Sequence, residues 1–231
     1  MPQQLPLDLE TPDRFSREQF IVTPGLQAVL DVLLCPETWL GEHLILWGAE
    51  GSGKSHLGHL FADHFIAHYV SAAESFAQDA AQLHVGSYVV DDAEMASEDF
   101  LFHLCNHTNK FQKNLVLLTK IHPLDWNPNL PDLGSRIRAM RLLAVPEPDQ
   151  SLLISILNKL FAQRAISPSP DFIDYLAKRM DRSVKAAQKI VTDIELYANG
   201  RPFNRALARD FIDETSALSQ PDNDDANFES F

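Results

Sequence analysis

A glycine-rich stretch of eight residues constrains this chain more than any other feature. It has the pattern Gly-x-x-x-x-Gly-Lys-Ser and consists of Gly48, Ala49, Glu50, Gly51, Ser52, Gly53, Lys54 and Ser55. Glycines let successive backbone N–H groups point at one anion, while the lysine brings a cation to the terminal phosphates and the serine hydroxyl can reach a magnesium ion. The pattern therefore predicts a phosphate-binding loop.

The residues on either side of this stretch favour a phosphate loop over a chance match in a glycine-containing turn. The apolar run Leu44–Trp47 precedes the loop and suits a buried parallel strand. Apolar residues follow at helical spacing, namely Leu57, Leu60, Phe61 and Phe65. The N-terminal dipole of such a helix attracts phosphate. We expect ATP or ADP to bind here with Mg²⁺, and we count His56, Ile21 and Val22 among the nucleotide contacts.

Two further apolar runs end in polar residues that suit the same site. One run ends in Asp91 and Asp92, and the other ends in Thr119. Ligands bind at the carboxyl ends of parallel strands, so we expect Asp91 to hold Mg²⁺ together with Ser55. Asp92 is expected to orient or deprotonate the attacking water, and Thr119 to hydrogen-bond the terminal phosphate or the water. The plainer alternatives are an Asx turn at the aspartates and a strand-capping threonine.

Composition and charge narrow the classes of protein. The chain has 231 residues, of which 45% are hydrophobic and 22% charged, which is ordinary for a globular protein with a real core. Its formal net charge of −13 disfavours general nucleic-acid binding, so we expect no direct sequence-specific DNA contact. Two cysteines form no disulfide framework, and we find no secretory signal and no membrane span. We expect a cytoplasmic protein.

Patterning along the chain predicts four parts: a tail over residues 1–18, an α/β core over 19–147, a helical unit over 148–218 and an acidic tail over 219–231. In the core we expect strands near 44–47, 67–71, 88–91, 115–119 and 142–145, and helices near 26–33, 54–65, 74–83 and 98–112. Three apolar stripes between 149 and 200 predict a three-helix unit, and a further helical stretch follows near 204–218.

The N-terminal tail contains an apolar peptide in a polar setting. In an extended segment Leu5, Leu7 and Leu9 lie on one side. Such a peptide often docks into a pocket of a partner protein; the alternative is a loose tail or a strand that folds back on the core. The segment resembles the short peptide by which replication proteins bind the bacterial sliding clamp, the beta subunit of polymerase III. Gln4, Leu7, Asp8 and Leu9 fit that pattern.

Taken together, these features resemble the DnaA-related group of AAA+ ATPases, and within it proteins of the Hda type. The resemblance rests on Gly-Ser-Gly-Lys-Ser-His-Leu at 51–57, on Ser135-Arg136 before the last strand, and on the clamp-type peptide at the N-terminus. It implies a three-layer αβα core with a parallel sheet, followed by a small all-helical lid. It also implies that Arg136 acts as an arginine finger, with the sliding clamp and DnaA as partners and with homo-oligomers possible.

Two positions depart from the family pattern. Lys185, in Ser183-Val184-Lys185, stands where the lid of DnaA has an arginine, and lysine lacks the planar fork that grips a phosphate. Asp92 stands where many AAA+ proteins have a catalytic glutamate. The resemblance therefore implies a weak or partner-dependent ATPase. DnaA continues into a DNA-binding domain, whereas an acidic segment follows the helical unit here.

From these observations we expect a clamp-tethered regulator that stimulates ATP hydrolysis by DnaA and represses re-initiation of replication. Two alternatives remain open at this point. One is a self-sufficient AAA+ ATPase resembling a helicase loader, and the other is an adaptor that uses nucleotide only as a structural ligand.

Overall fold

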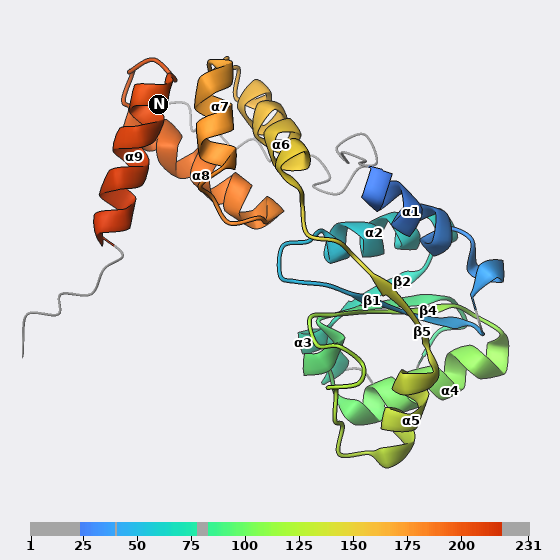
Figure 1. Ribbon diagram of the computed structural model, residues 1–231. Helices are drawn as coiled ribbons and strands as arrows, with labels where there is room; N and C mark the ends of the chain where they lie inside the picture. Colours follow the sequence, from blue (N-terminus) through green and yellow to red (C-terminus); the bar gives the residue numbers. More distant parts are fainter. Residues whose placement is uncertain (1–23, 40, 78–82, 219–231) are drawn as a thin grey trace, which may run out of the picture. The chain divides into compact units, whose positions relative to one another are not determined.

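The computed structural model describes residues 24–39, 41–77 and 83–218 (Figure 1). The chain divides into two compact units, residues 1–146 and residues 147–231. Each unit is described by itself. The clamp-type peptide with Gln4, Leu5, Leu7, Asp8 and Leu9 lies outside the described residues, as do Ile21 and Val22.

The first unit is built on a five-stranded parallel sheet. Its strands are β1 (His43–Trp47), β2 (His68–Ser71), β3 (Tyr88–Asp91), β4 (Leu115–Thr119) and β5 (Arg141–Ala144), in the order β2-β3-β4-β1-β5. In the register of the sheet Trp47 lies opposite Thr119, and Ser71 lies opposite Asp91. Because all strands run the same way, their carboxyl ends meet at one edge. The predicted α/β fold with a parallel sheet is confirmed.

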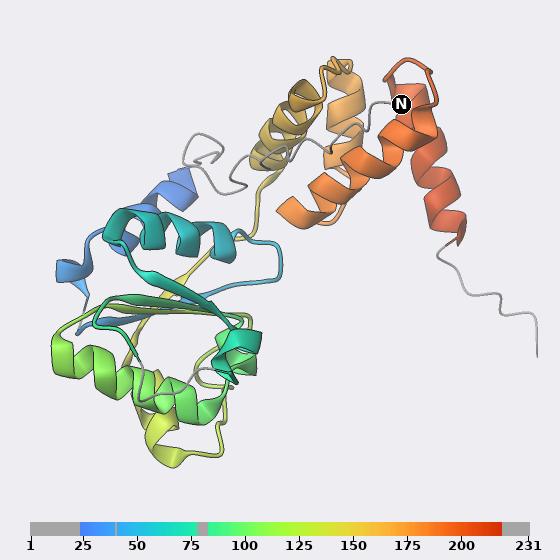
Figure 2. The ribbon, with the colours of Figure 1, turned by 180° about the vertical axis from the view of Figure 1, so that it is seen from behind.

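Helices cover both faces of this sheet, which gives the three layers. The helices α1 (Pro24–Leu33) and α2 (Lys54–Phe65) lie on one face, and α4 (Glu98–Phe111) and α5 (Pro131–Ala139) lie on the other (Figures 1 and 2). Successive side chains of a strand point to opposite faces. In β1, Leu44 and Leu46 therefore join the core beneath α1 and α2, while Ile45 joins the core beneath α4 and α5. Burial on both faces explains why the strands read as continuous apolar runs.

The predicted helix over 74–83 is wrong in its described part. The helix α3 spans Ala72–Ser75, residues 76 and 77 form a turn, and residues 78–82 lie outside the described residues. A capping box sets its start, because the Ser71 side chain accepts a hydrogen bond from the backbone N–H of Glu74 while the Glu74 carboxylate accepts one from the backbone N–H of Ser71. Phe76, the first residue after α3, is 71% exposed and so adds no packing that would extend the helix.

The second unit consists of helices in its described part. They are α6 (Gln150–Gln163), α7 (Pro170–Ala177), α8 (Val184–Ala198) and α9 (Arg205–Leu218), and three phenylalanines meet among them: Phe161, Phe172 and Phe203. The prediction of a three-helix unit needs correction, because α9 packs against both α7 and α8. Its buried residues Leu207, Ala208 and Phe211 complete the core.

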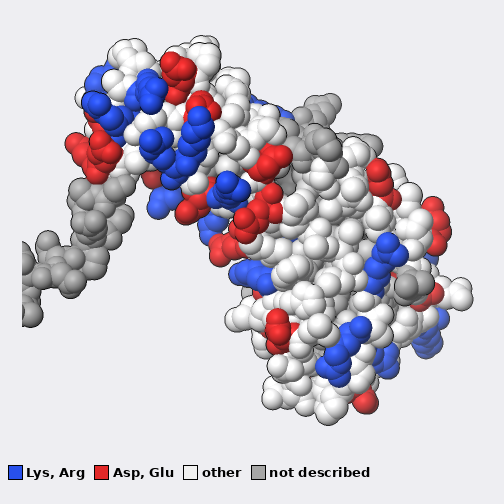
Figure 3. All heavy atoms as spheres, in the orientation of Figure 1, with Lys and Arg blue, Asp and Glu red and all other residues white. Residues whose placement is uncertain are grey.

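The surface carries charges of both signs. On the face shown in Figure 3, Lys and Arg side chains stand among Asp and Glu side chains. None of the helices in the described part of the chain is both long and apolar enough to cross a membrane.

Candidate nucleotide-binding site

The phosphate-loop sequence lies between β1 and α2, as its flanking residues predict. β1 ends at Trp47 and α2 begins at Lys54. Gly51 and Gly53 have φ values of 74° and 100°, in the left-handed region that residues with a Cβ avoid. The backbone N–H of Gly48 donates to the Thr119 carbonyl at 3.2 Å. The loop therefore begins at the end of β1, beside the end of β4, and leads into the N-terminus of α2, where backbone N–H groups are available for an anion.

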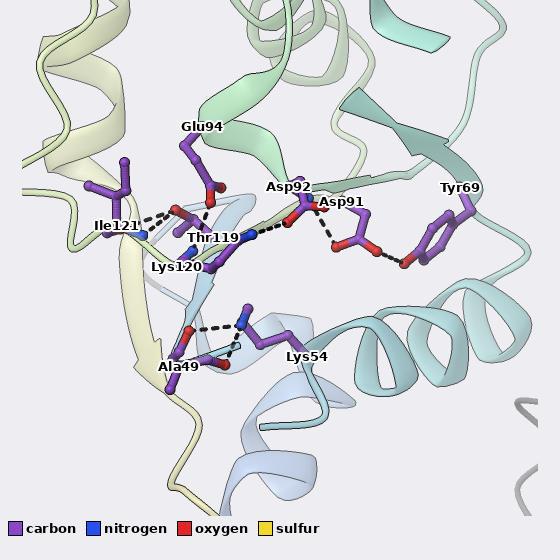
Figure 4. Close-up of polar contacts among 10 residues, drawn as sticks. Ala49, Lys54, Tyr69, Asp91, Asp92, Glu94, Thr119, Lys120 and Ile121 are labelled. Carbon is purple, nitrogen blue, oxygen red and sulfur yellow. Dashed lines mark hydrogen bonds and ion pairs between the residues drawn. The ribbon is translucent and has the colours of Figure 1, made fainter. Parts of the chain in front are cut away.

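Lys54 is held inside this loop. Its ammonium donates to the carbonyl oxygens of Gly48 and Ala49, both at 2.8 Å (Figure 4). The residue is only 7% exposed, and burial lowers its pKa, while the nearby carboxylates of Glu94 and Asp91 oppose that effect. A phosphate oxygen at the mouth of the loop would replace the carbonyls as the partner of this cation.

The two aspartates after β3 have different surroundings. Asp91 is half-buried, and its Oδ2 accepts a hydrogen bond from the Tyr69 hydroxyl at 2.7 Å. The Asp92 side chain is 54% exposed and lies 3.4 Å from the ammonium of Lys120. Asp92 also has a left-handed backbone, with φ 48°. Asp91 therefore points into the site from a fixed position, while Asp92 pairs with a lysine at its rim (Figure 4).

Thr119 is buried at the end of β4, and its hydroxyl is engaged within the following turn. It donates to the Ile121 carbonyl at 3.1 Å and accepts from the Ile121 backbone N–H at 3.0 Å. The hydroxyl has a single proton, so a hydrogen bond to phosphate requires that this turn open. In this structure Thr119 serves as a strand-ending residue, and its contact with nucleotide stays a prediction.

Glu94 belongs to the site although the sequence analysis did not select it. It lies in the short helix η4 (Ala93–Met95), and its Oε1 accepts from the backbone N–H of Lys120 at 3.2 Å. Its Oε2 is buried without a hydrogen-bond partner among the described residues. Of the carboxylates that raise the pKa of Lys54, Glu94 has the largest effect. The sequence signal that could have identified Glu94 is its position as a third acidic residue, two residues after Asp92.

The oxygen donors expected to hold Mg²⁺ fit that ion. Ser55 is half-buried in the first turn of α2, and both its side chain and the Asp91 carboxylate interact with the hydroxyl of Tyr69. The two groups therefore lie within reach of one side chain. Mg²⁺ takes oxygen ligands and usually relies on one or two protein groups plus phosphates. Of the other candidates, His56 is half-buried and Glu50 is exposed at the loop tip.

Arg136 lies at the opposite edge of the sheet. It is half-buried on α5, with its guanidinium carbon 5.2 Å from the centroid of the Phe102 ring. Burial, and secondarily the charge of Arg136, lowers the pKa of His43 to about 4. Arg136 is in the last turn of α5, which leads into the amino end of β5, whereas the phosphate loop follows the carboxyl end of β1. Lys185 is exposed in the first turn of α8, in the other unit.

Comparison with known proteins finds distant relatives among DnaA proteins. No protein-family model matches the chain. It is 23% identical over 192 residues to the chromosomal replication initiator protein DnaA of Cutibacterium acnes, covering 71% of this chain and 38% of the relative. It is 25% identical over 193 residues to DnaA of Bacteroides thetaiotaomicron, covering 72% and 40%. The chain thus spans about two fifths of the length of these relatives.

Solved structures agree with this sequence similarity. Domain III of the Thermotoga maritima replication initiation protein DnaA has a TM-score of 0.71 at 18% identity, over 88% of this chain and 97% of that one. The chain is thus similar in sequence to DnaA and has the fold of its AAA+ domain. DnaA from Aquifex aeolicus bound to AMPPCP has a TM-score of 0.69 at 20% identity, over 91% of this chain and 72% of that one. The Thermotoga maritima RuvB branch migration motor shares the fold at 15% identity and a TM-score of 0.67, over 87% and 72%.

The predicted site residues that the structure describes in the first unit form two groups. Lys54, Ser55, Asp91, Asp92 and Thr119 come together at the carboxyl edge of the sheet. Arg136 lies at the amino edge, away from that group. The first group has the chemistry to bind a phosphate chain with magnesium. Arg136 does not belong to that group.

Proposed function

We propose that this protein is a nucleotide-binding regulator of the Hda type. The peptide with Gln4, Leu7, Asp8 and Leu9 would tether it to the sliding clamp, and its core would stimulate ATP hydrolysis by DnaA and so repress re-initiation of replication. Similarity to the initiator DnaA over most of the chain supports a role in replication initiation. The observation that carries the proposal is the separation of the phosphate loop from Arg136 at opposite edges of one parallel sheet.

The carboxyl edge is the proposed site for ATP or ADP with Mg²⁺. The buried cation of Lys54 suits the terminal phosphates, and the oxygens of Ser55 and Asp91 suit the ion. When bound, the ion would neutralise charge on the phosphates. The AMPPCP-bound DnaA of Aquifex aeolicus, which shares this fold, supports an adenine nucleotide. The pairing of Asp92 with Lys120 supports only weak hydrolysis by the protein alone.

The amino edge is the proposed surface for action on a partner. Arg136 lies in the last turn of α5 against the Phe102 ring, which supports a role toward phosphates held by another subunit. An arginine supplied by one protein to the nucleotide of another raises hydrolysis by about 10³- to 10⁵-fold. We propose that this nucleotide is the ATP of DnaA. Head-to-tail contact with a second copy of this chain would use the same edges.

The deciding experiment is a DnaA–ATP hydrolysis assay with clamp loaded on DNA. The intact protein is compared with Arg136→Ala and with a variant in which Gln4, Leu7 and Leu9 are alanine. Arg138→Ala is the matched control, because Arg138 is an exposed arginine of the same helix. We expect stimulation to be lost with Arg136→Ala, to depend on the clamp through residues 4–9, and to survive Arg138→Ala. Nucleotide binding by Arg136→Ala, measured separately, should equal that of the intact protein.

Other results would favour the alternatives. Substantial turnover of ATP by the protein alone, without DnaA, would indicate a self-sufficient ATPase. Clamp binding without stimulation, together with a folding defect in Lys54→Ala, would indicate an adaptor with a structural nucleotide. Stimulation that survives Arg136→Ala would remove the proposed role of that residue.

A further inference from the structure

Tyr69 of β2 connects the two groups that are expected to hold the magnesium ion. Its hydroxyl donates to Oδ2 of Asp91 at 2.7 Å (Figure 4). The contact is diagonal, because Tyr69 pairs with Val89 and Asp91 lies two residues further along β3. The Ser55 side chain interacts with the same hydroxyl from the first turn of α2. The other oxygen of Asp91, Oδ1, accepts from the backbone N–H of Asp92 at 3.0 Å. Both oxygens of the Asp91 carboxylate are therefore fixed in direction.

The Tyr69 ring is itself fixed by α2. The His59 ring stacks on it with a centroid distance of 3.8 Å and an interplanar angle of 5°. Gly58 leaves space for the edge of the Tyr69 ring, because a Cβ at position 58 would lie 3.2 Å from Cε2 of the tyrosine. Both residues belong to the helix that carries Lys54 and Ser55. The Tyr69 ring is thus held by α2, the helix that follows the phosphate loop.

In the contact with Asp91 the phenol hydroxyl is the donor and the carboxylate oxygen is the acceptor. Groups that hydrogen-bond a metal ligand orient it and tune its affinity, and their loss typically costs 10- to 100-fold in metal binding.

We propose that Tyr69 is a positioning residue for magnesium-bound nucleotide: it holds the Asp91 carboxylate in the orientation that the ion requires and is itself held by His59 and Gly58. This inference rests on the proposed nucleotide function, and it deepens that function by adding a residue from a strand outside the phosphate-loop pattern. Tyr69 needs no contact with the nucleotide, because it acts through Asp91.

The test compares Tyr69→Phe with Tyr88→Phe. Phenylalanine keeps the ring that stacks on His59 and removes only the hydroxyl. Tyr88 is a matched control, since it is a buried tyrosine of the adjacent strand β3 whose hydroxyl donates at 2.9 Å to the His84 carbonyl instead of Asp91. The affinity of the full chain for a fluorescent mant-ADP is measured in EDTA and across a Mg²⁺ titration.

We expect Tyr69→Phe to need about 10-fold more Mg²⁺ for its half-maximal effect, with unchanged affinity in EDTA. Tyr88→Phe should match the intact protein. Combining Tyr69→Phe with Asp91→Asn should cost no more than Asp91→Asn alone, because the two residues act as one unit.

Three results would overturn the inference. The first is an unchanged Mg²⁺ requirement in Tyr69→Phe. The second is a lower Mg²⁺ requirement, which would mean that the phenol competes with the ion. The third is an equal loss of mant-ADP affinity with and without Mg²⁺, which would mean a purely structural role. If the intact protein binds mant-ADP under neither condition, the proposed nucleotide function fails instead, and the two failures are thereby distinguished.

Discussion

Replacement of Gly58 by alanine tests how tightly α2 is pressed against the sheet. A Cβ at this position would lie 2.7 Å from Cδ1 of Leu118, 3.1 Å from Cγ1 of Val89 and 3.2 Å from Cε2 of Tyr69. Leu118 and Val89 are fully buried in the middle of their strands, so neither has space into which to move. The added methyl group must therefore push the helix away from the sheet.

Two opposing effects set the size of the change. Alanine is favoured over glycine inside a helix by about 0.5–1 kcal/mol. Overpacking of a close-packed core by one carbon costs about 1–3 kcal/mol. The cost of overpacking exceeds the gain in helix propensity, so we expect Gly58→Ala to lower the free energy of unfolding by about 1–2 kcal/mol. For a chain of this size that corresponds to a fall of about 2–8 °C in the melting temperature.

The assay is urea and thermal unfolding of the variant, combined with the affinity for mant-ADP. Affinity should fall as well, because α2 carries Lys54 and Ser55. Gly25→Ala is the control, since a Cβ there would make an ordinary contact of 3.6 Å with Pro146, and we expect it to be neutral or slightly stabilising. A Gly58→Ala protein as stable as the intact one, or more stable, would show that α2 is not held at this distance and would refute the packing reasoning.

Two further predictions concern positions outside the nucleotide site. Ile66 follows α2 in the left-handed region with φ 52° and is 89% exposed. Ile66→Gly should therefore relieve backbone strain without losing contacts and raise the free energy of unfolding, measured by urea titration, by about 0.5–1 kcal/mol. A loss of stability would contradict this. His43 is buried with a pKa of about 4, below the value of 6.5 expected in the unfolded chain, so the unfolded state takes up its proton first and stability falls as pH drops from 6.5 to 4. The contribution is about 3 kcal/mol, and His43→Gln, which can still bond Thr108, should lose that much less stability over this range; equal losses in both proteins would refute it.

Much of the fold follows from the apolar pattern, because the strands are buried on both faces. A short, uninterrupted apolar run such as 115–119 is typical of a central parallel strand, and β4 spans those residues. The phosphate loop is equally predictable, since its glycines and its place between a strand and a helix are local features. The prediction fails at the short α3, which begins earlier than expected because a capping box fixes its start and ends before the exposed Phe76. The role of α9 as a fourth packed helix also depends on contacts remote in sequence.

The site was predictable only where its residues follow strands. Asp91 and Thr119 end their strands, so parallel topology alone brings them to one edge. Glu94 and Tyr69 lack such a signature. Glu94 reaches the site through a short helix. Tyr69 reaches Asp91 because β2 pairs with β3 so that Tyr69 lies opposite Val89, two residues before Asp91. A tyrosine inside an apolar run looks like core until the neighbouring strand is known.

The same topology bears on Arg136. In a parallel sheet, a residue in the last turn of a helix that leads into a strand lies at the amino edge, while the phosphate loop lies at the carboxyl edge. Arg136 is in the last turn of α5, and β5 begins directly afterwards at Arg141. Five-residue strands hold the two edges about 13–17 Å apart, well beyond the reach of one side chain. An arginine at this position therefore acts on the phosphates of a different subunit or on none, and the stimulation assay with Arg136→Ala decides between these two cases.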